Sequence, residues 1–364
     1  MRRGHPLITA VLVGALAMWA CGPGGAGPGS TGPKERLVFG GFGGAYEKAW
    51  TTIVIPAFEK KYNAEVSYVV GGMDPELVAR LKAGGSRPPY DVVALGQDRI
   101  VDLADQGLLE KLDPAKVPNL ANVYPLFKDA FDSYAVGTDV TPEGIGWNTQ
   151  AVQTPFTSWG DLWRSDLKGR IALPDITHSL MIDFLAMTAL MNGGATKDGQ
   201  MVKITDAGKA FDALKQLRPS VKSFYTSSFD ANTALQTKQV NVIITYSGRI
   251  QELKDGGFPA QWVAPKEGSW PSLATIAVPK GTLHSDLADK FIDFALSPEM
   301  QSAYNASLLY APVVTNATLP ADVAAKVPHG EDLFKSFLFL DYRQINQQRS
   351  DWENRWNREI LPNP

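Results

Sequence analysis

The sequence contains almost no cysteine, few histidines and no strong excess of either charge. Cys21 is the only cysteine among 364 residues, so an internal disulfide is excluded. The chain has 35 Lys and Arg against 38 Asp and Glu, a net charge of −3, which gives no reason to expect nucleic acid as a partner. No apolar run is long enough for a comfortable membrane span.

The sequence also lacks the short motifs that mark common enzymes. It has no G-x-S-x-G, no Walker A motif and no H-E-x-x-H, and one of its four histidines lies in the N-terminal leader. Metal-ligand spacing is absent as well. We therefore predict a protein that is not an enzyme and holds neither a cofactor nor a metal.

The first 21 residues have the pattern of a secretory signal. A positively charged start is followed by an apolar stretch from Leu7 to Ala20 and then by Cys21. A lone cysteine at the cleavage point resembles the lipobox of bacterial lipoproteins, although Met18 and Trp19 depart from that pattern. We expect a lipid on Cys21, with simple cleavage or a retained anchor as the alternatives; the residues that flank a twin-arginine signal are missing.

Residues 22–35 are rich in Gly, Pro, Ala, Ser and Thr and are expected to form a flexible tether. Together with a lipid anchor, this segment predicts a protein in the periplasm or at the cell surface. The remaining chain is longer than one hydrophobic core usually supports, so we expect two domains.

The folded chain is expected to begin with a strand, a glycine turn and a helix. Leu37–Phe39 is apolar, Gly40–Gly44 contains four glycines, and a helix follows over 45–62 with a kink or break at Pro56. An open α/β sheet presents backbone N–H groups to a ligand in this way. The G-x-G-x-x-G spacing is absent, which argues against a dinucleotide site.

Strands and helices alternate after this turn. A strand over 65–70, a helix from Asp74 to Gly84–Gly85, a strand over 91–95 and a helix over 98–106 predict a doubly wound α/β sheet. Further strands are expected at 144–148, 171–175, 240–246 and 275–278, helices near 158–163, 181–191 and from 297, and a last helix that carries Trp352 and Trp356.

Six short motifs extend in order over nearly all of the mature chain. They are ELVARLKAGGS at 76–86, YDVV at 90–93, GLL at 107–109, SWGDLW at 158–163, PKEG at 265–268 and DKFIDFALSPEMQ at 289–301. In this order and spacing, the chain resembles the polyamine-type periplasmic solute-binding proteins of ABC importers.

The resemblance implies a two-lobe, type II periplasmic-binding-protein fold. Two α/β lobes would be joined by crossover strands at a hinge and would close over the solute. Lobe one would hold residues 36–140 and 272–318, and lobe two residues 141–271 and 319–364. The implied partners are a small-molecule solute and an ABC permease in the cytoplasmic membrane, and we expect a monomer held to the membrane only by its lipid.

A polyamine needs carboxylates for its ammonium groups and aromatic faces for its methylenes. The resemblance places suitable residues at three such positions: Asp175, Tyr246 and Tyr310. A second acid is replaced by His178, a crossover acid by Ala274 and a neighbouring aromatic by Ser272. Because two of three ammonium partners are missing, the sequence argues against a long di- or triamine.

Other residues offer charge to the same cleft. Asp139 and Glu143 precede Gly144 on the expected crossover, and Gly96 and Asp98 follow the strand over 91–95. Arg249 could instead bind a carboxylate.

The solute class is therefore left open among three possibilities. A polyamine-like amine would use the acids, a zwitterion such as a γ-amino acid would use Asp175 and Arg249, and a monocarboxylate would use Arg249 alone. Each residue also has a structural alternative: Asp175 as a helix cap, Arg249 in an ion pair, His178 in a loop, and Asp139 with Glu143 in a solvated turn.

The glycine turn is expected to form the floor of the cleft. In the family an aromatic residue of this turn stacks on the ligand, a role that would fall to Phe42 or Tyr46. Free amides at a helix start favour a carboxylate. This shifts the expected solute toward one with an anionic end.

Three other classes of function remain as alternatives. A glycosidase would use paired carboxylates such as Asp139 and Glu143. A ferric-ion binder would need an adjacent tyrosine pair, which Tyr310 does not have. A surface lipoprotein without a transport role would bind no small molecule.

Overall fold

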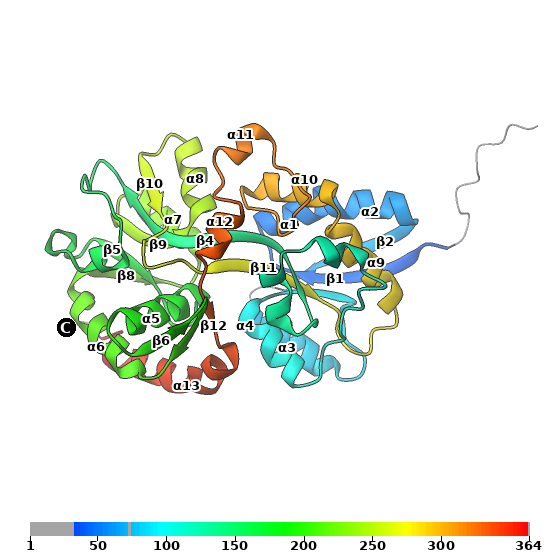
Figure 1. Cartoon of the computed structure of the whole chain (residues 1–364), viewed down its shortest axis with the longest axis horizontal. Helices are drawn as coiled ribbons and strands as arrows, with labels where there is room; N and C mark the ends of the chain where they lie inside the picture. The colour runs from blue at the N-terminus through cyan, green and yellow to red at the C-terminus, as the bar shows by residue number, and fades with distance from the viewer. Residues whose placement is uncertain (1–32, 72–73, 363–364) are drawn as a thin grey trace, which may run out of the picture. The chain divides into compact units, whose positions relative to one another are not determined.

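A computed structural model describes residues 33–71 and 74–362 (Figure 1). The predicted signal, Cys21 and most of the predicted tether lie outside the described residues. Within the described part of the chain, no helix combines the length and apolarity needed to cross a membrane.

One nine-stranded sheet runs through the described chain in the order β2-β1-β3-β11-β4-β9-β5-β8, with β10 paired to β4. A smaller sheet has the order β12-β7-β6. The strands are β1 Glu35–Gly41, β2 Ala64–Val70, β3 Val92–Gly96, β4 Val136–Asn148, β5 Ile171–Pro174, β6 Ala195–Asp198, β7 Met201–Ile204, β8 Val221–Tyr225, β9 Val242–Tyr246, β10 Ala260–Val263, β11 Pro271–Ala277 and β12 Phe339–Leu340.

Strand β4 joins the two halves of the large sheet. Its first part pairs antiparallel with β11 and its second part with β9, and the change of partner falls between Pro142 and Glu143. Pro142 lies opposite Pro271 of β11. Because proline has no backbone N–H, this position suits a strand that leaves one half of a sheet and enters the other.

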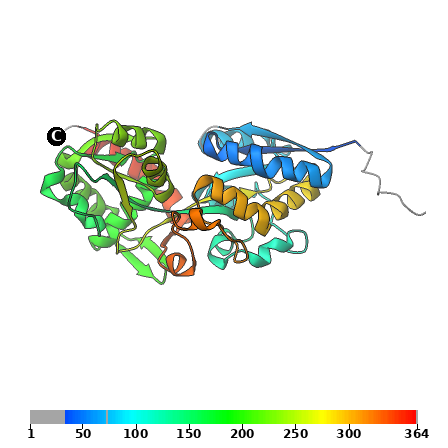
Figure 2. The same ribbon diagram turned by 90° about the horizontal axis from the view of Figure 1, so that it is seen from above.

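The helices cover the sheet on both sides of this crossover (Figures 1 and 2). They are α1 Ala45–Ala49, α2 Ile55–Tyr62, α3 Asp74–Gly84, α4 Gln97–Asp105, α5 Ser179–Met191, α6 Ala207–Leu217, α7 Ser228–Gln236, α8 Ser247–Asp255, α9 Ser285–Ala295, α10 Pro298–Leu308, α11 Ala321–Ala324, α12 Glu331–Lys335 and α13 Tyr342–Glu359.

Local chemistry explains two of these elements. The expected helix over 45–62 is broken, because a π-helical turn at Trp50–Val54 separates α1 from α2 and Pro56 lies in the first turn of α2. Proline cannot donate the helical hydrogen bond, so the turn before it widens. The predicted helix at 158–163 is a 3₁₀ turn, Trp159–Trp163, capped by Ser158 and Asp161.

Two large hydrophobic cores lie on either side of the crossover. The first core draws its buried residues from 37–140 and 273–339, and the second from 145–270 and 338–360. Leu319, Val327 and Phe334 pack in the first core. These residues lie beyond the predicted lobe boundary at 318, and the boundaries themselves stay predictions.

The glycine turn is shorter than the sequence suggests. Gly40 and Gly41 belong to β1. A Cβ atom on Gly40 would lie 2.7 Å from the Tyr90 ring, and one on Gly41 would lie 2.3 Å from the Tyr68 hydroxyl. Close packing therefore explains these two glycines. Gly44 has a φ of +73°, a backbone conformation that favours glycine, and starts α1.

Candidate functional site

Strand β4 carries two acids at the crossover, Asp139 and Glu143. Both are buried, with exposed fractions of 2% and 3%. Asp139 lies opposite Ala274 of β11, whereas Glu143 lies opposite Tyr246 of β9. The prediction that these acids lie on the crossover is confirmed, but they belong to a strand rather than to a solvated turn.

Asp139 is enclosed by hydrogen-bond donors of the first core. Its Oδ2 accepts from the Tyr304 hydroxyl at 2.9 Å and from the Thr138 hydroxyl at 3.0 Å. Trp50 Nε1 donates to the Tyr304 oxygen at 3.2 Å, which completes a chain of donors. Burial raises the pKa of Asp139 to about 6, and the bonds from Tyr304 and Thr138 oppose that rise.

The aromatic residues of the glycine turn pack beside Asp139. Tyr46 lies edge-on to Phe42 at 5.1 Å and to Tyr304 at 6.2 Å between ring centroids. The buried Tyr46 hydroxyl has no hydrogen-bond partner of normal geometry among the described residues. Burial and then the charge of Asp139 raise the pKa of this hydroxyl. Stacking of Phe42 or Tyr46 on a ligand stays a prediction.

Glu143 meets a second carboxyl group instead of donors. Asp183 of α5 is also buried, 6% exposed, and lies close enough to Glu143 for each carboxyl group to affect the pKa of the other. Two buried carboxyl groups this close favour a shared proton, because ionising both is costly. Burial raises the pKa of both groups. The charge of Asp183 raises the pKa of Glu143 further, whereas the interaction with Glu143 opposes the rise in the pKa of Asp183.

Asp98 and Arg349 join this pair from the two cores. Asp98 lies in the first turn of α4, and its Oδ2 is 2.6 Å from Nη2 of Arg349 on α13. Asn346, one turn earlier on α13, donates to the backbone oxygen of Asp98 at 3.1 Å. Both charged side chains are nearly buried, 12% and 13% exposed. Gly96, the N-cap of α4, pairs with Ala274 at the end of β3.

Tyrosine side chains form a wall around Glu143. Tyr246 faces Glu143, and the nearby Ser272 and Ser179 side chains lower the pKa of its hydroxyl. Burial, followed by the charge of Glu143, raises the pKa of Tyr246. Tyr310 lies within the electrostatic reach of Tyr246. The structure therefore brings together Glu143 and the predicted residues Tyr246, Ser272 and Tyr310.

Arg249 lies beside Tyr310 at the start of α8. Its Nη1 binds Glu252 at 3.0 Å, so the predicted ion-pair alternative is part of the geometry. Its Nε is buried and has no hydrogen-bond partner in the described chain. Tyr310 and then the carboxylate of Glu252 raise the pKa of Arg249, against the effect of burial. The guanidinium thus keeps one buried N–H without a partner among the described residues.

Asp175 and His178 make hydrogen bonds near their own loop, and Asp175 also accepts one from α13. Asp175 Oδ1 accepts from the backbone and hydroxyl of Thr177, and its Oδ2 accepts from Trp356 Nε1 at 3.2 Å. His178 Nδ1 accepts from the Leu180 N–H and caps α5. Burial lowers the pKa of His178 to about 4, so this ring is neutral at pH 7. Their contact with a solute stays a prediction.

A cavity of about 440 Å³ lies between elements of the two cores. Tyr342, the first residue of α13, lines this cavity and is also within electrostatic reach of Asp183, Asp98, Glu143 and Arg349. The other lining residues are mostly apolar: Val101, Leu126, Ala130, Gln200, Met201, Phe339, Leu340, Asp341 and Arg343. The cavity therefore reaches a residue that lies within electrostatic reach of the carboxyl pair.

Sequence reasoning missed Asp183, Arg349 and Tyr342. Asp183 had a signal, because it is the one charged residue in the apolar stretch 179–191. Arg349 and Tyr342 had none, since the last helix is polar along most of its length and its approach to α4 is a tertiary contact. No group of three or more metal-binding side chains occurs in residues 33–71 and 74–362.

Known proteins share both the sequence pattern and the fold. The gamma-aminobutyric acid-binding protein of Pseudomonas aeruginosa is 29% identical over 81% of this chain and 82% of that protein. The spermidine/putrescine-binding periplasmic protein of Escherichia coli is 28% identical over 84% of this chain and 85% of that protein. The spermidine/putrescine-binding periplasmic protein 1 of Haemophilus influenzae is 28% identical over 69% of this chain and 70% of that protein.

An ABC transporter structure from Clostridium perfringens superimposes with a TM-score of 0.76 at 24% identity, covering 89% of this chain and 99% of that one. This likeness supports the two-lobe fold, with the first and second cores as the centres of its lobes. The family described as bacterial extracellular solute-binding protein matches residues 54–329. The chain therefore belongs to the family of bacterial extracellular solute-binding proteins.

Proposed function

We propose that this protein binds a small organic solute with an ammonium group between its two lobes and delivers it to the permease of an ABC importer. The observation that carries the proposal is the buried carboxyl pair of Glu143 and Asp183 at the crossover. Asp98 reaches the pair from the other lobe, where it is itself paired with Arg349.

A buried carboxyl pair is costly unless a positive charge accompanies it. In the unliganded protein a shared proton fulfils this role, since two like charges cannot both ionise at close range. An ammonium group carries the same charge and can donate hydrogen bonds to both carboxylates. Such charged hydrogen bonds contribute about 1.5–3 kcal/mol each, so a few of them are enough for micromolar affinity.

The relatives support an amine. Their names specify spermidine, putrescine and gamma-aminobutyric acid, and each of these compounds carries at least one primary amino group. Tyr225, Tyr246 and Tyr342, which lie within electrostatic reach of Glu143, supply aromatic faces beside the carboxyl pair, which suits the methylenes next to an ammonium group.

Native mass spectrometry of the purified protein, followed by a thermal-shift panel, tests this proposal. We expect n-pentylamine, putrescine, spermidine or gamma-aminobutyrate to raise the melting temperature, and pentanoate, which lacks nitrogen, to leave it unchanged. A protein stabilised by pentanoate but by none of the amines would contradict the proposal. Asp183→Asn should remove the response to amines.

A zwitterion is a second candidate, favoured by the unpartnered edge of Arg249. Its carboxylate would bind the guanidinium while its ammonium group meets the carboxyl pair. Arg249→Met should then weaken gamma-aminobutyrate and leave n-pentylamine unaffected. Equal weakening of both compounds would assign Arg249 a structural role within α8.

We also propose the cellular setting from the sequence. Cys21 would carry a lipid, residues 22–35 would tether the monomeric body to the membrane, and catalysis would play no part. Mass spectrometry of the N-terminal peptide from cells tests the anchor, because Cys21→Ser should remove the lipid mass and release the protein.

A further inference from the structure

Arg349 is the cation that approaches the carboxyl pair from within the protein. It extends from α13, whose buried face belongs to the second core, and pairs with Asp98 of α4, which packs on the first core. Its Nε is buried without a hydrogen-bond partner among the described residues. The guanidinium is thus held by one strong contact, at 2.6 Å, and lies within electrostatic reach of Asp183.

The carboxyl groups around the pair outnumber the nearby guanidinium groups by one. Three carboxyl groups, Asp98, Glu143 and Asp183, face two guanidinium groups, Arg349 and Arg99, whose Nε lies 3.4 Å from Asp98. The shared proton supplies the remaining charge in the unliganded protein. The other titratable groups that face the pair are tyrosines, neutral at pH 7: Tyr225 of β8, Tyr246 of β9 and Tyr342 of α13.

We propose that Arg349, by neutralising Asp98, leaves one negative charge for the solute, so that the site selects a single ammonium group over a diamine of the same length. The inference rests on the proposed function and adds the charge of the solute to it. When the solute binds, its ammonium group takes the place of the shared proton, which leaves to solvent.

The adjoining cavity suits the uncharged part of such a solute. Its walls are largely apolar, with Val101 and Leu126 from one side and Met201 and Phe339 from the other. A hydrocarbon chain gains free energy there by leaving water, whereas a second ammonium group would lose its hydration without a free carboxylate to replace it. Arg343 at the cavity rim is already paired with Asp105 and Asp132.

Two isosteric ligands distinguish the effect of ligand charge on affinity from the effect of ligand size. n-Pentylamine and putrescine differ only in whether the far end is a methyl or an ammonium group. Calorimetric titration at neutral pH should show wild-type protein binding n-pentylamine at least about tenfold more tightly than putrescine. Arg349→Met should shift the ratio of the two affinities toward putrescine by about tenfold or more, because a negative charge is added to the site.

Three further variants distinguish the loss of the Arg349 charge from a structural effect of the substitution. Arg355→Met removes another arginine of α13, one that pairs with Glu359 away from the cavity and the carboxyl pair, and should leave the ratio within about twofold. Arg349→Lys keeps the charge and should retain the preference for n-pentylamine. The double variant Asp98→Asn with Arg349→Met removes both partners, avoids an unpaired buried charge and should restore the wild-type ratio.

The outcomes are distinct. If the ratio of the n-pentylamine and putrescine affinities is the same in wild-type protein and in Arg349→Met, the role of Arg349 is overturned while the proposed function stands. A ratio that shifts as far in Arg355→Met would overturn it too, since the loss of any arginine from α13 would then be the cause. If neither amine binds wild-type protein, the proposed function fails and this inference fails with it.

Discussion

Asp139 and Glu143 are buried acids four residues apart on one strand, yet their surroundings differ. Asp139 accepts hydrogen bonds from Tyr304 and Thr138 and has a network that is complete within the first core. Glu143 faces another carboxyl group, Asp183, and depends on a shared proton. A buried acid surrounded by donors is part of the scaffold, whereas one that faces a like charge requires a cation.

This difference is the basis for the proposed position of the solute. Asp139 lies in the part of β4 that pairs with β11, and Glu143 lies in the part that pairs with β9. The first acid helps to hold the crossover in place, and the second is the proposed binding group. Each variant below tests one side of this comparison, and the expected effects decrease from one to the next.

Glu143→Gln should break the binding side. An amide can still hydrogen-bond to Asp183, so we expect the fold to remain and its stability to be unchanged or raised. Affinity for the bound amine should fall by about 1.5–3 kcal/mol, the contribution of a charged hydrogen bond. Calorimetric titration measures this loss, and an unchanged affinity would remove Glu143 from the site.

Asp139→Ala should break the scaffold side. The Tyr304 and Thr138 hydroxyls would lose their buried acceptor, which costs about 1–3 kcal/mol of unfolding free energy. Urea denaturation measures this loss. Amine affinity should change by less than about twofold, and a large loss of binding in a folded variant would show that Asp139 also contacts the solute.

The pH dependence of stability should report Asp139 separately. Its folded pKa of about 6 exceeds the unfolded value of about 3.9, so its contribution is fully present below the unfolded pKa and lost as pH rises through 6. Lowering the pH from 7 to 5 should therefore stabilise wild-type protein by about 1 kcal/mol relative to Asp139→Asn. Parallel pH profiles of the two proteins would contradict the raised pKa.

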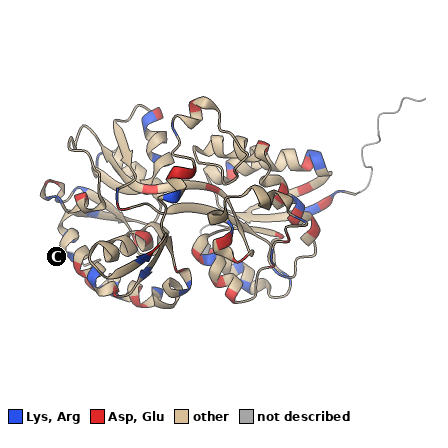
Figure 3. Ribbon diagram, viewed as in Figure 1, with Lys and Arg blue, Asp and Glu red and all other residues tan. Residues whose placement is uncertain are grey.

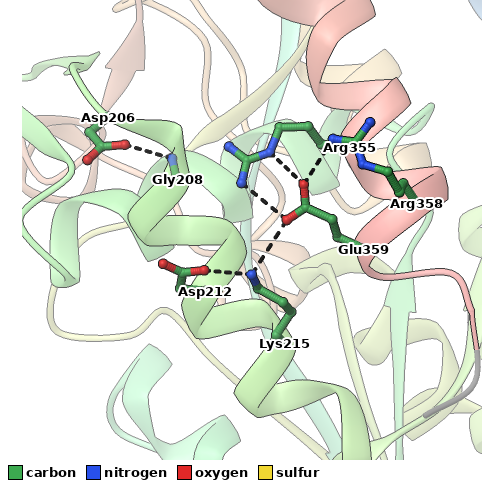
Figure 4. Close-up of polar contacts among 7 residues, drawn as sticks. All are labelled: Asp206, Gly208, Asp212, Lys215, Arg355, Arg358 and Glu359. Carbon is green, nitrogen blue, oxygen red and sulfur yellow. Dashed lines mark hydrogen bonds and ion pairs between the residues drawn. The ribbon is translucent and has the colours of Figure 1, made fainter.

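Glu359→Gln should have the smallest effect, because it lies away from the crossover. In Figure 4, Glu359 accepts from Arg355 and Arg358 and approaches Lys215 of α6, which ties the end of α13 to the second core. The Arg355 guanidinium lowers the pKa of Glu359 to about 2. The network is partly exposed, so we expect a loss of about 0.5–1 kcal/mol in thermal unfolding and unchanged binding; altered binding would mean that α13 transmits changes along its length.

Much of the fold follows from local sequence chemistry. Pro56 interrupts its helix, Ser158 and Asp161 form the predicted cap, and the alternation of strands and helices gives the doubly wound sheet. These features depend on residues close together in the sequence. Acidic and basic residues are interspersed over both lobes, in keeping with the small net charge (Figure 3).

The candidate site was less accessible to sequence reasoning. The acids on β4 were identified, but their different surroundings were not. Tyr304, which donates to Asp139, lies 165 residues away in the sequence, and Asp183, which faces Glu143, lies on α5. The contact of Arg349 with Asp98 spans 251 residues. Such contacts arise from the packing of whole elements, so neither spacing nor periodicity could reveal them.

A crystal structure of the protein with its most stabilising amine tests the central claim most directly. The account predicts the ammonium nitrogen within about 3 Å of carboxyl oxygens of both Glu143 and Asp183, with the hydrocarbon chain beside Tyr342. An ammonium nitrogen bound at Asp175 or Asp139, with Glu143 and Asp183 still hydrogen-bonded to each other, would contradict it.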